Sequence, residues 1–406
     1  ILCLNNRKSK IQNLKFYKRP QPLKIENRNS EILHMSTLYP CKVQPQVQDF
    51  TPYTAGLSIE EIKAEYNLFR VIKLASNENP LGCSPYVQKV IARSASFGFR
   101  YPRPGNPELC QALAEFYRLS PDNFVVSNGS DEAIDLLLRV MARPGKDHVL
   151  VFDPCFSMYR LQARLCGVDV RSVPLNPDFS FPFAELLRIA DQNTALVFVT
   201  NPDNPSGYAA PREKLLEIAA RLPESCLLVV DEAYLEFADD PEAVSPLSEL
   251  PECTNLVILR TFSKLYGLAG LRLGYGIMPP WLRDYLMRVK PPFSVNLLAE
   301  QAGIAALRDG YFAGETRRTV LAGKSYLKRE LKATGCTVFS SQANFLLFKP
   351  PIPAKSLYER LLRQGIIVRP LGSYGLDDYL RVSIGNTHEN KAFILAMQDI
   401  LSQPSV

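Results

Sequence analysis

Residues 255–275 read NLVILRTFSKLYGLAGLRLGY and give the strongest indication of the fold. The mostly apolar residues 255–259 predict a buried strand. Lys264 follows just past the end of this strand, among hydroxyl and glycine residues, and Arg272 comes eight residues later. Because open α/β sheets bind ligands at the carboxyl ends of their strands, the stretch predicts a strand of such a sheet and a site at its edge.

The side chains of this stretch suit one kind of ligand. A lysine held out of bulk water loses its proton more easily and can attack an aldehyde. Thr261 and Ser263 supply hydroxyl donors and Arg272 supplies a bidentate cation, which are the groups that a phosphate needs. An aldehyde and a phosphate on one small molecule describe pyridoxal phosphate. The alternative is that Lys264 is an ordinary surface lysine on a loop.

The whole pattern from residue 260 to residue 275 resembles the Schiff-base segment of aminotransferases of pyridoxal-phosphate fold type I. The resemblance implies that Lys264 is the catalytic lysine and holds pyridoxal 5'-phosphate as a Schiff base. It also implies an α/β fold with a large doubly wound, mostly parallel-sheet domain and a smaller α/β domain. Thr261, Ser263 and Arg272 are then cofactor-binding residues.

A second predicted strand ends in an acid. Residues 227–234 read LLVVDEAY, and a carboxylate at the C-terminal end of a buried strand is well placed for a ligand. A coenzyme that acts as an electron sink needs its pyridine nitrogen protonated, and Asp231 can keep it so as an ion pair. Tyr234 could donate its hydroxyl to the phenolate oxygen of the ring. A helix cap or a surface ion pair is the alternative for Asp231.

A rigid turn follows the predicted strand 195–200. Residues 201–207 read NPDNPSG, and each proline fixes φ and restricts the residue before it. Such a turn can point one amide at a cofactor, so Asn204 is the candidate for a second donor to the phenolate oxygen. The turn resembles the Asn-Pro-x-Asn-Pro-Thr-Gly loop of the family, with Ser206 at the place of the commoner threonine. The alternative is a plain strand-to-helix turn.

Residues 123–137, NFVVSNGSDEAIDLL, predict a strand, a tight turn and a helix. Gly129 and Ser130 would open the helix, where free backbone N–H groups form an anion site. Ser130, Asp131 and Glu132 match the phosphate-cradling turn of the family. Contact through the backbone is expected at Asp131, because its carboxylate would repel a phosphate. A simple N-cap by Ser130 or Asp131 is the alternative, and both roles can hold together.

A further predicted strand and turn lie at residues 149–159, VLVFDPCFSMY. By resemblance, Phe156 is the aromatic side chain that stacks on the pyridine ring. Without the family, an aromatic residue after a strand is more often part of the core.

Within the fold type, residues 36–406 most closely resemble the histidinol-phosphate aminotransferase family. Residues 73–82, KLASNENPLG, match its N-terminal signature. Residues 100–102, RYP, match the segment whose tyrosine crosses a dimer interface to the neighbour's coenzyme phosphate. Tyr101 is therefore expected to bind cofactor in a homodimer with shared active sites.

Two arginines complete the resemblance. They lie in GIIVRP at 365–370 and in LRVSIG at 380–385, and the resemblance makes Arg369 and Arg381 substrate-binding residues. Tyr53 is expected to be a further phosphate contact, and Asn204 is expected to contact the substrate as well. A substrate that carries a phosphate at one turnover and two carboxylates at the next needs such bidentate cations. Strand-end surface charge is the alternative for both arginines.

The resemblance implies conversion of L-histidinol phosphate and 2-oxoglutarate to imidazole-acetol phosphate and L-glutamate in histidine biosynthesis. Lys264 would move the proton as general base and then acid. An aromatic-amino-acid aminotransferase and a threonine-phosphate decarboxylase of the same fold are the alternatives. A coenzyme-binding regulator fused to a DNA-binding module is a different class, which the neutral body of the chain disfavours.

Composition excludes other classes. The 406 residues are 46% hydrophobic and 22% charged, as in an ordinary globular protein with room for two domains. No apolar run reaches the roughly eighteen residues of a membrane span. Nine cysteines form no C-x-x-C pair and only three histidines exist, so no metal site is expected. Unpaired cysteines favour a cytoplasmic setting.

The net charge of +6 belongs to one end of the chain. Residues 1–35 hold eight Lys and Arg against Glu26 and Glu31, and the remainder is neutral, so no nucleic-acid partner is expected. Residues 1–34 are predicted to be a basic tail that is not native or is disordered, with Met35 as the natural start. A transit peptide is the alternative.

The expected domain organisation follows from the alternation of strands and helices. Residues 35–75 are predicted to form an N-terminal arm and part of the small domain, 76–290 the large coenzyme-binding domain, and 291–406 the small C-terminal domain.

Overall fold

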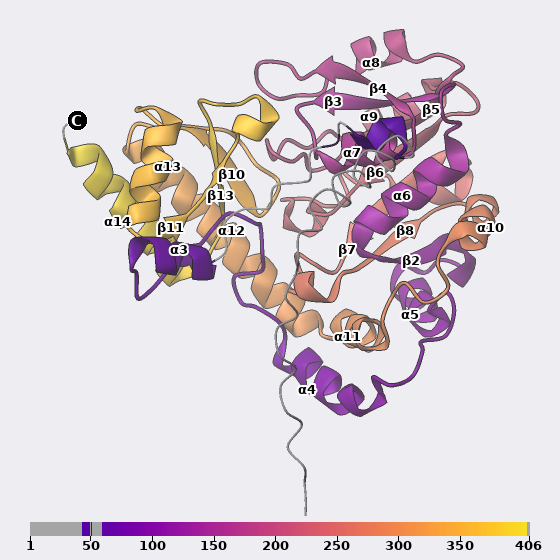
Figure 1. Ribbon diagram of the computed structural model, residues 1–406, viewed down its shortest axis with the longest axis horizontal. Coiled ribbons are helices and arrows are strands. Elements are labelled where there is room, and N and C mark those ends of the chain that lie inside the picture. The colour runs from indigo at the N-terminus through magenta and orange to yellow at the C-terminus, as the bar shows by residue number, and fades with distance from the viewer. Residues whose placement is uncertain (1–42, 49, 51–58, 404–406) are drawn as a thin grey trace, which may run out of the picture. The chain divides into compact units, whose positions relative to one another are not determined.

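The computed structural model describes residues 43–48, 50 and 59–403. The chain divides into two compact units, residues 1–51 and 52–406. In the first unit the described residues contain one short helix, α2 (Pro45–Gln48). The elements named below belong to the second unit (Figure 1).

A seven-stranded sheet forms the centre of the second unit, in the order β2-β8-β7-β6-β5-β3-β4. Strands β7, β6, β5, β3 and β4 pair with one another in parallel, while β8 runs antiparallel to both β2 and β7. The predicted large, mostly parallel sheet is therefore confirmed. The strands are β2 (Phe124–Asn128), β3 (His148–Asp153), β4 (Asp169–Pro174), β5 (Thr194–Thr200), β6 (Leu227–Asp231), β7 (Leu256–Thr261) and β8 (Leu273–Ile277).

The central strands are nearly continuous apolar runs because helices cover both faces of the sheet. Along β5, Val197 and Val199 belong to one buried core, while Leu196 and Phe198 belong to the other. The second core also contains residues of α6, α7 and α10, and the first contains residues of α5, α8, α9 and α11. These helices are α5 (Pro107–Tyr117), α6 (Gly129–Met141), α7 (Met158–Leu165), α8 (Phe183–Ile189), α9 (Arg212–Arg221), α10 (Pro280–Val289) and α11 (Leu297–Arg308).

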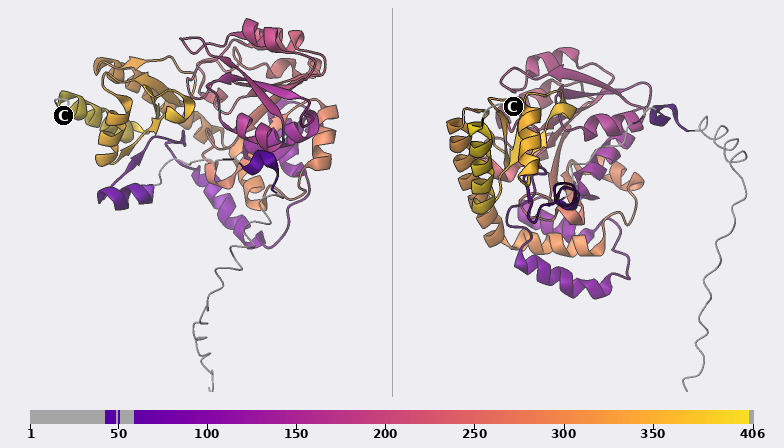
Figure 2. Two further views of the ribbon diagram at one scale, coloured as in Figure 1. Left: turned by 45° about the horizontal axis from the view of Figure 1, so that its top comes forward. Right: turned by 60° about the vertical axis from the view of Figure 1, so that its left-hand side comes forward.

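A smaller antiparallel sheet, in the order β12-β13-β10-β9, is built from the C-terminal part of the chain, and a parallel pair joins β1 to β11. Figure 2 shows the yellow helices α13 and α14 lying together beside it. The elements are β1 (Ile72–Lys73), β9 (Thr337–Val338), β10 (Phe345–Lys349), β11 (Ile366–Ile367), β12 (Arg369–Pro370), β13 (Leu380–Ser383), α3 (Ile59–Tyr66), α4 (Pro85–Ser94), α12 (Gly310–Ala333), α13 (Ala354–Arg363) and α14 (Thr387–Ser402). The described residues also contain short 3₁₀ helices, which are η2 (Ala95–Phe97), η3 (Pro121–Asn123), η4 (Leu235–Phe237), η5 (Leu247–Glu252), η6 (Ala269–Leu271) and η7 (Gly372–Tyr374).

Two local features differ from expectation. The sequence at 366–369, three apolar residues followed by Arg369, is typical of a single strand, but it divides into β11, which pairs with β1, and β12, which pairs with β13. Pro370 at the end of β12 has no N–H to donate, which limits how far a ladder can continue there. Strand β8 was not predicted, because Gly274 and Gly276 interrupt its apolar pattern. Both glycines face close neighbours, as described below for Gly274. The predicted domain boundaries stay a prediction.

The sheet brings the loops of the site together. Thr200 at the end of β5 stands opposite Asp231 at the end of β6, and β7 ends beside them at Thr261. Three loops therefore leave the same edge of the sheet, which is where parallel sheets bind their ligands. Among the described residues, no helix has the length and apolarity needed to cross a membrane.

Candidate active site

A cavity of about 180 Å³ opens at this edge of the seven-stranded sheet. Residues from α6, from the loop before α7, and from the ends of β5, β6 and β7 contribute to it. Its lining consists of Ser130, Asp131, Phe156, Thr200, Asn204, Asp231, Ala233, Tyr234, Thr261, Ser263, Lys264, Ala269 and Arg272. Ten of the residues predicted for cofactor or catalysis are in this group, although they come from five separate stretches of the sequence.

Lys264 lies three residues after β7, and its side chain reaches into this cavity. Its Nζ donates to the carbonyl of Ser76 at 3.2 Å and stands 5.6 Å from the centre of the Tyr234 ring. Burial, followed by the charge of Arg381, lowers the pKa of Lys264 to about 8. Roughly a tenth of this amine is therefore uncharged at pH 7, far more than for a free lysine, and only the uncharged form can act as a nucleophile or a general base.

Asp231 ends β6 and is 3% exposed. Its Oδ2 accepts from the hydroxyl of Tyr159 at 2.8 Å, and its Oδ1 accepts from the backbone N–H of Ala233 at 3.1 Å. Burial raises the pKa of Asp231 to about 6, while these two hydrogen bonds favour the ionised form. A cation at the mouth of the cavity would lower that pKa again.

Tyr234 is held by two amides. Its hydroxyl accepts from Asn77 Nδ2 at 3.2 Å and from Asn204 Nδ2 at 3.5 Å. The phenolic proton is thus free to be donated to another group in the cavity. Asn204 is 5% exposed, and the turn between β5 and α9 places it in the lining of the cavity.

Arg381 lies on β13 and approaches this group from the smaller sheet. Its Nη1 donates to Asn204 Oδ1 and its Nη2 donates to the carbonyl of Ala75. Its Nε is buried and has no hydrogen-bond partner among the described residues. An unsatisfied buried N–H is costly unless a ligand accepts from it, so Arg381 keeps one donor for an anionic group.

The other end of the cavity carries hydroxyls and a cation. Thr261 Oγ1 donates to Ser263 Oγ at 2.9 Å and accepts from the Ser263 backbone N–H at 3.0 Å. Arg272 Nη2 lies 3.1 Å from Asp131 Oδ2, while Ser130 stands at the first turn of α6. Burial raises the pKa of Asp131. Two hydroxyls, a guanidinium and the N-terminus of α6 form a donor set that fits a phosphate.

Two glycines permit this close arrangement. A Cβ on Gly129, which has φ +69°, would lie 2.5 Å from Arg272 Nη2. A Cβ on Gly274 would lie 2.5 Å from the backbone nitrogen of Ser130. Arg272 and the start of α6 can therefore approach the same space only because both positions lack a side chain.

Other predicted residues stand outside the lining. Oε2 of Glu132 accepts from the backbone N–H of Asn128 at 2.5 Å and from Ser294 Oγ at 3.0 Å, so this side chain supports the turn between β2 and α6. Tyr101 is 81% exposed and stacks on Phe293 at 4.7 Å. Arg369 is half-buried on β12, opposite Arg381 in the register of β13. Tyr53 and the predicted tail 1–34 lie outside the described residues.

Sequence reasoning missed three polar residues of the site. Asn77 belongs to the quoted signature 73–82 but received no role, and its Oδ1 accepts from Ser383 Oγ at 2.8 Å. Tyr159 and Thr200 each end a quoted stretch, and their hydroxyls lie 2.8 Å apart. The sequence places these residues near the site, but only the fold shows which atoms they contact.

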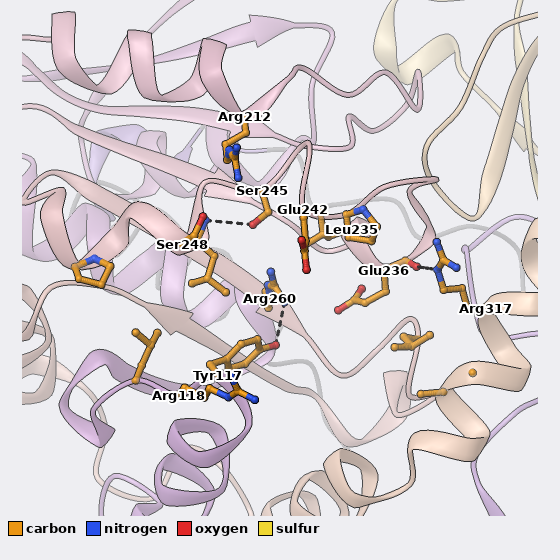
Figure 3. Close-up of a pocket in the computed structure, with 17 residues that line it drawn as sticks. Tyr117, Arg118, Arg212, Leu235, Glu236, Glu242, Ser245, Ser248, Arg260 and Arg317 are labelled. Atoms are coloured by element: carbon orange, nitrogen blue, oxygen red, sulfur yellow. Dashed lines mark hydrogen bonds between the residues drawn. The ribbon is translucent and has the colours of Figure 1, made fainter.

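A larger cavity of about 860 Å³ lies elsewhere on the second unit (Figure 3). The two linings share no residue, and this one contains no lysine. Its most buried charged residue, Arg260, pairs with Glu232 at 2.7 Å and donates to the Tyr117 hydroxyl at 3.0 Å. The predicted nucleophile, Lys264, lines the smaller cavity. The described residues contain no group of acidic, histidine and cysteine side chains that would hold a metal ion.

The family comparison agrees with this geometry. The model of the family "Aminotransferase class I and II" matches residues 70–396. The chain therefore belongs to the class I and II aminotransferases.

Similar proteins of known family show which family within this class the chain belongs to. A histidinol-phosphate aminotransferase of Oleidesulfovibrio alaskensis is 54% identical over 363 residues, which cover 88% of this chain and 95% of that protein. Within its class the chain thus belongs to the histidinol-phosphate aminotransferase family. A crystal structure of histidinol-phosphate aminotransferase from Sinorhizobium meliloti in complex with pyridoxal 5'-phosphate has a TM-score of 0.81 and 27% identity, and covers 88% of this chain and 97% of that one.

The fold also occurs in a decarboxylase. The crystal structure of L-threonine-O-3-phosphate decarboxylase from Porphyromonas gingivalis has a TM-score of 0.70 at 23% identity, covering 82% of this chain and all of that one. Likeness at this identity concerns the fold alone.

Proposed function

We propose that this protein transfers the amino group of L-histidinol phosphate to 2-oxoglutarate, with pyridoxal 5'-phosphate as its cofactor. The observation that carries the proposal is the convergence of Lys264, Asp231 and Tyr234 on one cavity, opposite a donor set for a phosphate. The 54% identical relative bears the name of this aminotransferase, which favours histidinol phosphate over an aromatic amino acid or threonine phosphate as the donor.

The residues present fit the cofactor. Ser130, Thr261, Ser263 and Arg272, with the backbone at the start of α6, would hold its phosphate. Lys264 would bond to its aldehyde carbon, and Phe156 would lie against its ring. When bound, pyridoxal phosphate supplies a ring that withdraws electrons from the substrate Cα.

Asp231, Tyr234 and Asn204 would orient the ring. Asp231 is a buried acceptor that can keep a pyridine nitrogen protonated. The Tyr234 hydroxyl, which accepts from Asn77, keeps its proton for the phenolate oxygen, and Asn204 Nδ2 adds a second donor. Donors that are already in place cost no reorganisation when charge develops.

Lys264 would move the proton. Its Nζ would accept the proton of the substrate Cα and later release it, and only the uncharged amine can accept a proton. The lowered pKa of Lys264, about 8, makes this uncharged form more available near neutral pH than it is for a free lysine.

Arg381 would bind the anionic end of both substrates. Its unpartnered Nε and its position between Asn204 and Ala75 suit a bidentate contact with a phosphate or a carboxylate. Arg369 lies next to it in the sheet and is proposed as the second cation.

The proposal also includes a homodimeric assembly and a location in the cytoplasm. The exposed Tyr101 is free to reach a neighbouring chain, which supports a homodimer with shared sites. The seven described cysteines are all free thiols, which suits the cytoplasm.

The test is a spectral titration of the purified chain. Adding pyridoxal phosphate should produce an absorption band that L-histidinol phosphate removes and 2-oxoglutarate restores. The variant Lys264→Ala should fail both steps, whereas the exposed Lys214→Ala should behave as the wild type. A response to phenylalanine or threonine phosphate but not to histidinol phosphate would contradict the substrate and keep the cofactor.

A further inference from the structure

Tyr159, on α7, is fully buried and lies next to the proposed site. The proposed mechanism gives this tyrosine no role. Its ring stacks on Phe198 with centroids 4.7 Å apart and an interplanar angle of 8°. Its hydroxyl lies 2.8 Å from Asp231 Oδ2 and 2.8 Å from Thr200 Oγ1. A phenol with two such contacts in the interior is part of a hydrogen-bond chain.

The direction of this chain follows from its members. An ionised carboxylate can only accept, so the single proton of Tyr159 is donated to Asp231. The Tyr159 oxygen must then accept from Thr200, whose hydroxyl carries the remaining proton of the pair. Hydrogen bonds arranged head to tail in a low-dielectric interior polarise one another, so the hydroxyl of Thr200 strengthens the bond from Tyr159 to Asp231.

Both oxygens of the Asp231 carboxylate accept hydrogen bonds. Oδ1 accepts from the backbone N–H of Ala233, and Oδ2 accepts from the hydroxyl of Tyr159. The other charged groups that act on Asp231 are Asp131 from α6 and Glu232 beside it, and both raise its pKa, as burial does. Tyr234 faces it from the same loop and stays neutral, because burial raises its own pKa. The bond from Tyr159 is thus a side-chain contact that favours the charged form.

We propose that Tyr159 is a positioning residue for the proposed transamination, whose hydroxyl, oriented by Thr200, keeps Asp231 ionised and in one orientation. The inference rests on the proposed function, because Asp231 acts there on the pyridine nitrogen. Tyr159 acts only through Asp231, since it does not line the cavity.

The test measures binding of pyridoxine 5'-phosphate to the full-length apoprotein between pH 5 and pH 9. This probe has the ring nitrogen and the phosphate but no aldehyde, so its affinity does not depend on a bond to Lys264. In the wild type, affinity should fall as the pH drops through the pKa of Asp231, about 6. In Tyr159→Phe the fall should begin about one pH unit higher, since a hydrogen bond to a charged group changes a pKa by about that amount.

Three further variants separate positioning from packing. Thr200→Val should shift the profile in the same direction by less, and the double variant should match Tyr159→Phe, because Thr200 acts through Tyr159. Tyr208→Phe removes the hydroxyl of a half-buried tyrosine outside the cavity and should coincide with the wild type. If Tyr159→Phe does not fold, as judged by circular dichroism, the pH at which the affinity of Thr200→Val falls tests the inference. Its affinity at high pH does not, because Thr200 itself lines the cavity.

The possible outcomes are distinct. A profile of Tyr159→Phe that coincides with the wild type, or an equal shift in Tyr208→Phe, overturns the inference and leaves Tyr159 a packing residue. A wild type that binds no pyridoxine phosphate at any pH overturns the cofactor proposal itself. A shift in Tyr159→Phe that Thr200→Val partly reproduces supports the inference.

Discussion

At the scale of single residues, the environment of Lys264 predicts how the apoprotein captures its cofactor. Only the uncharged amine attacks an aldehyde, and burial lowers the pKa of Lys264 to about 8. The rate of pyridoxal phosphate capture should therefore rise with pH and level off above about pH 8, not above the pKa of roughly 10.4 of a free lysine. Stopped-flow absorbance between pH 6 and pH 11 measures this. A rate that still rises steeply at pH 10 would contradict the lowered pKa.

Replacing Arg381 is expected to weaken catalysis with both substrates. Arg381→Gln removes the charge and the Nε donor while keeping a side chain that can bond to Asn204. Hydrogen bonds to charged groups contribute about 1.5–3 kcal/mol, so kcat/KM should fall roughly 10- to 100-fold for both histidinol phosphate and 2-oxoglutarate. Steady-state kinetics check this, with the exposed Arg164→Gln on α7 as the control. A loss confined to one of the two substrates would show that Arg381 binds only that one.

At the scale of elements, the contact between β8 and α6 decides whether the phosphate end of the cavity forms. In Gly274→Ala, the new Cβ meets the backbone of Ser130, which cannot move without shifting the first turn of α6. We expect a loss of about 1–3 kcal/mol in the free energy of unfolding, together with weaker cofactor binding. Chemical denaturation and a cofactor titration measure the two effects. Gly270→Ala has open space around its Cβ and should change neither; an unaffected Gly274→Ala would mean that β8 and α6 can separate without cost.

At the scale of the whole molecule, the exposure of Tyr101 leads us to expect active sites that are shared between the two chains of a homodimer. Lys264→Ala and Tyr101→Ala should each be inactive or nearly so as homodimers. Mixed after mild unfolding, they should recover roughly a quarter of wild-type activity, because half of the dimers are hybrids and each hybrid has one intact site of two. Activity of the mixture against the separate variants measures this. No recovery, although hybrids form, would show that each chain builds its site alone.

The sequence by itself determined the class of fold and most of the residues that line the cavity of the proposed site. Apolar runs that end in Asp231, in the turn at Asn204 and in the segment of Lys264 are local signals, because a strand and the turn after it are specified by adjacent residues. The same holds for Gly129 and Ser130 at the start of α6. These stretches predicted a mostly parallel sheet with a site at its carboxyl edge, and the structure has both.

Only the tertiary structure decided what depends on residues far apart in the chain. Arg381 meets Asn204 across 177 positions, and Asn77 meets Tyr234 across 157. Glu132 turns its carboxylate to Ser294 and away from the cavity, and Tyr159 reaches Asp231 from a helix on one face of the sheet. No pattern of neighbouring residues encodes such contacts. They arise because packing seven strands in a non-sequential order brings separate loops to one edge, where side-chain geometry then selects the partners.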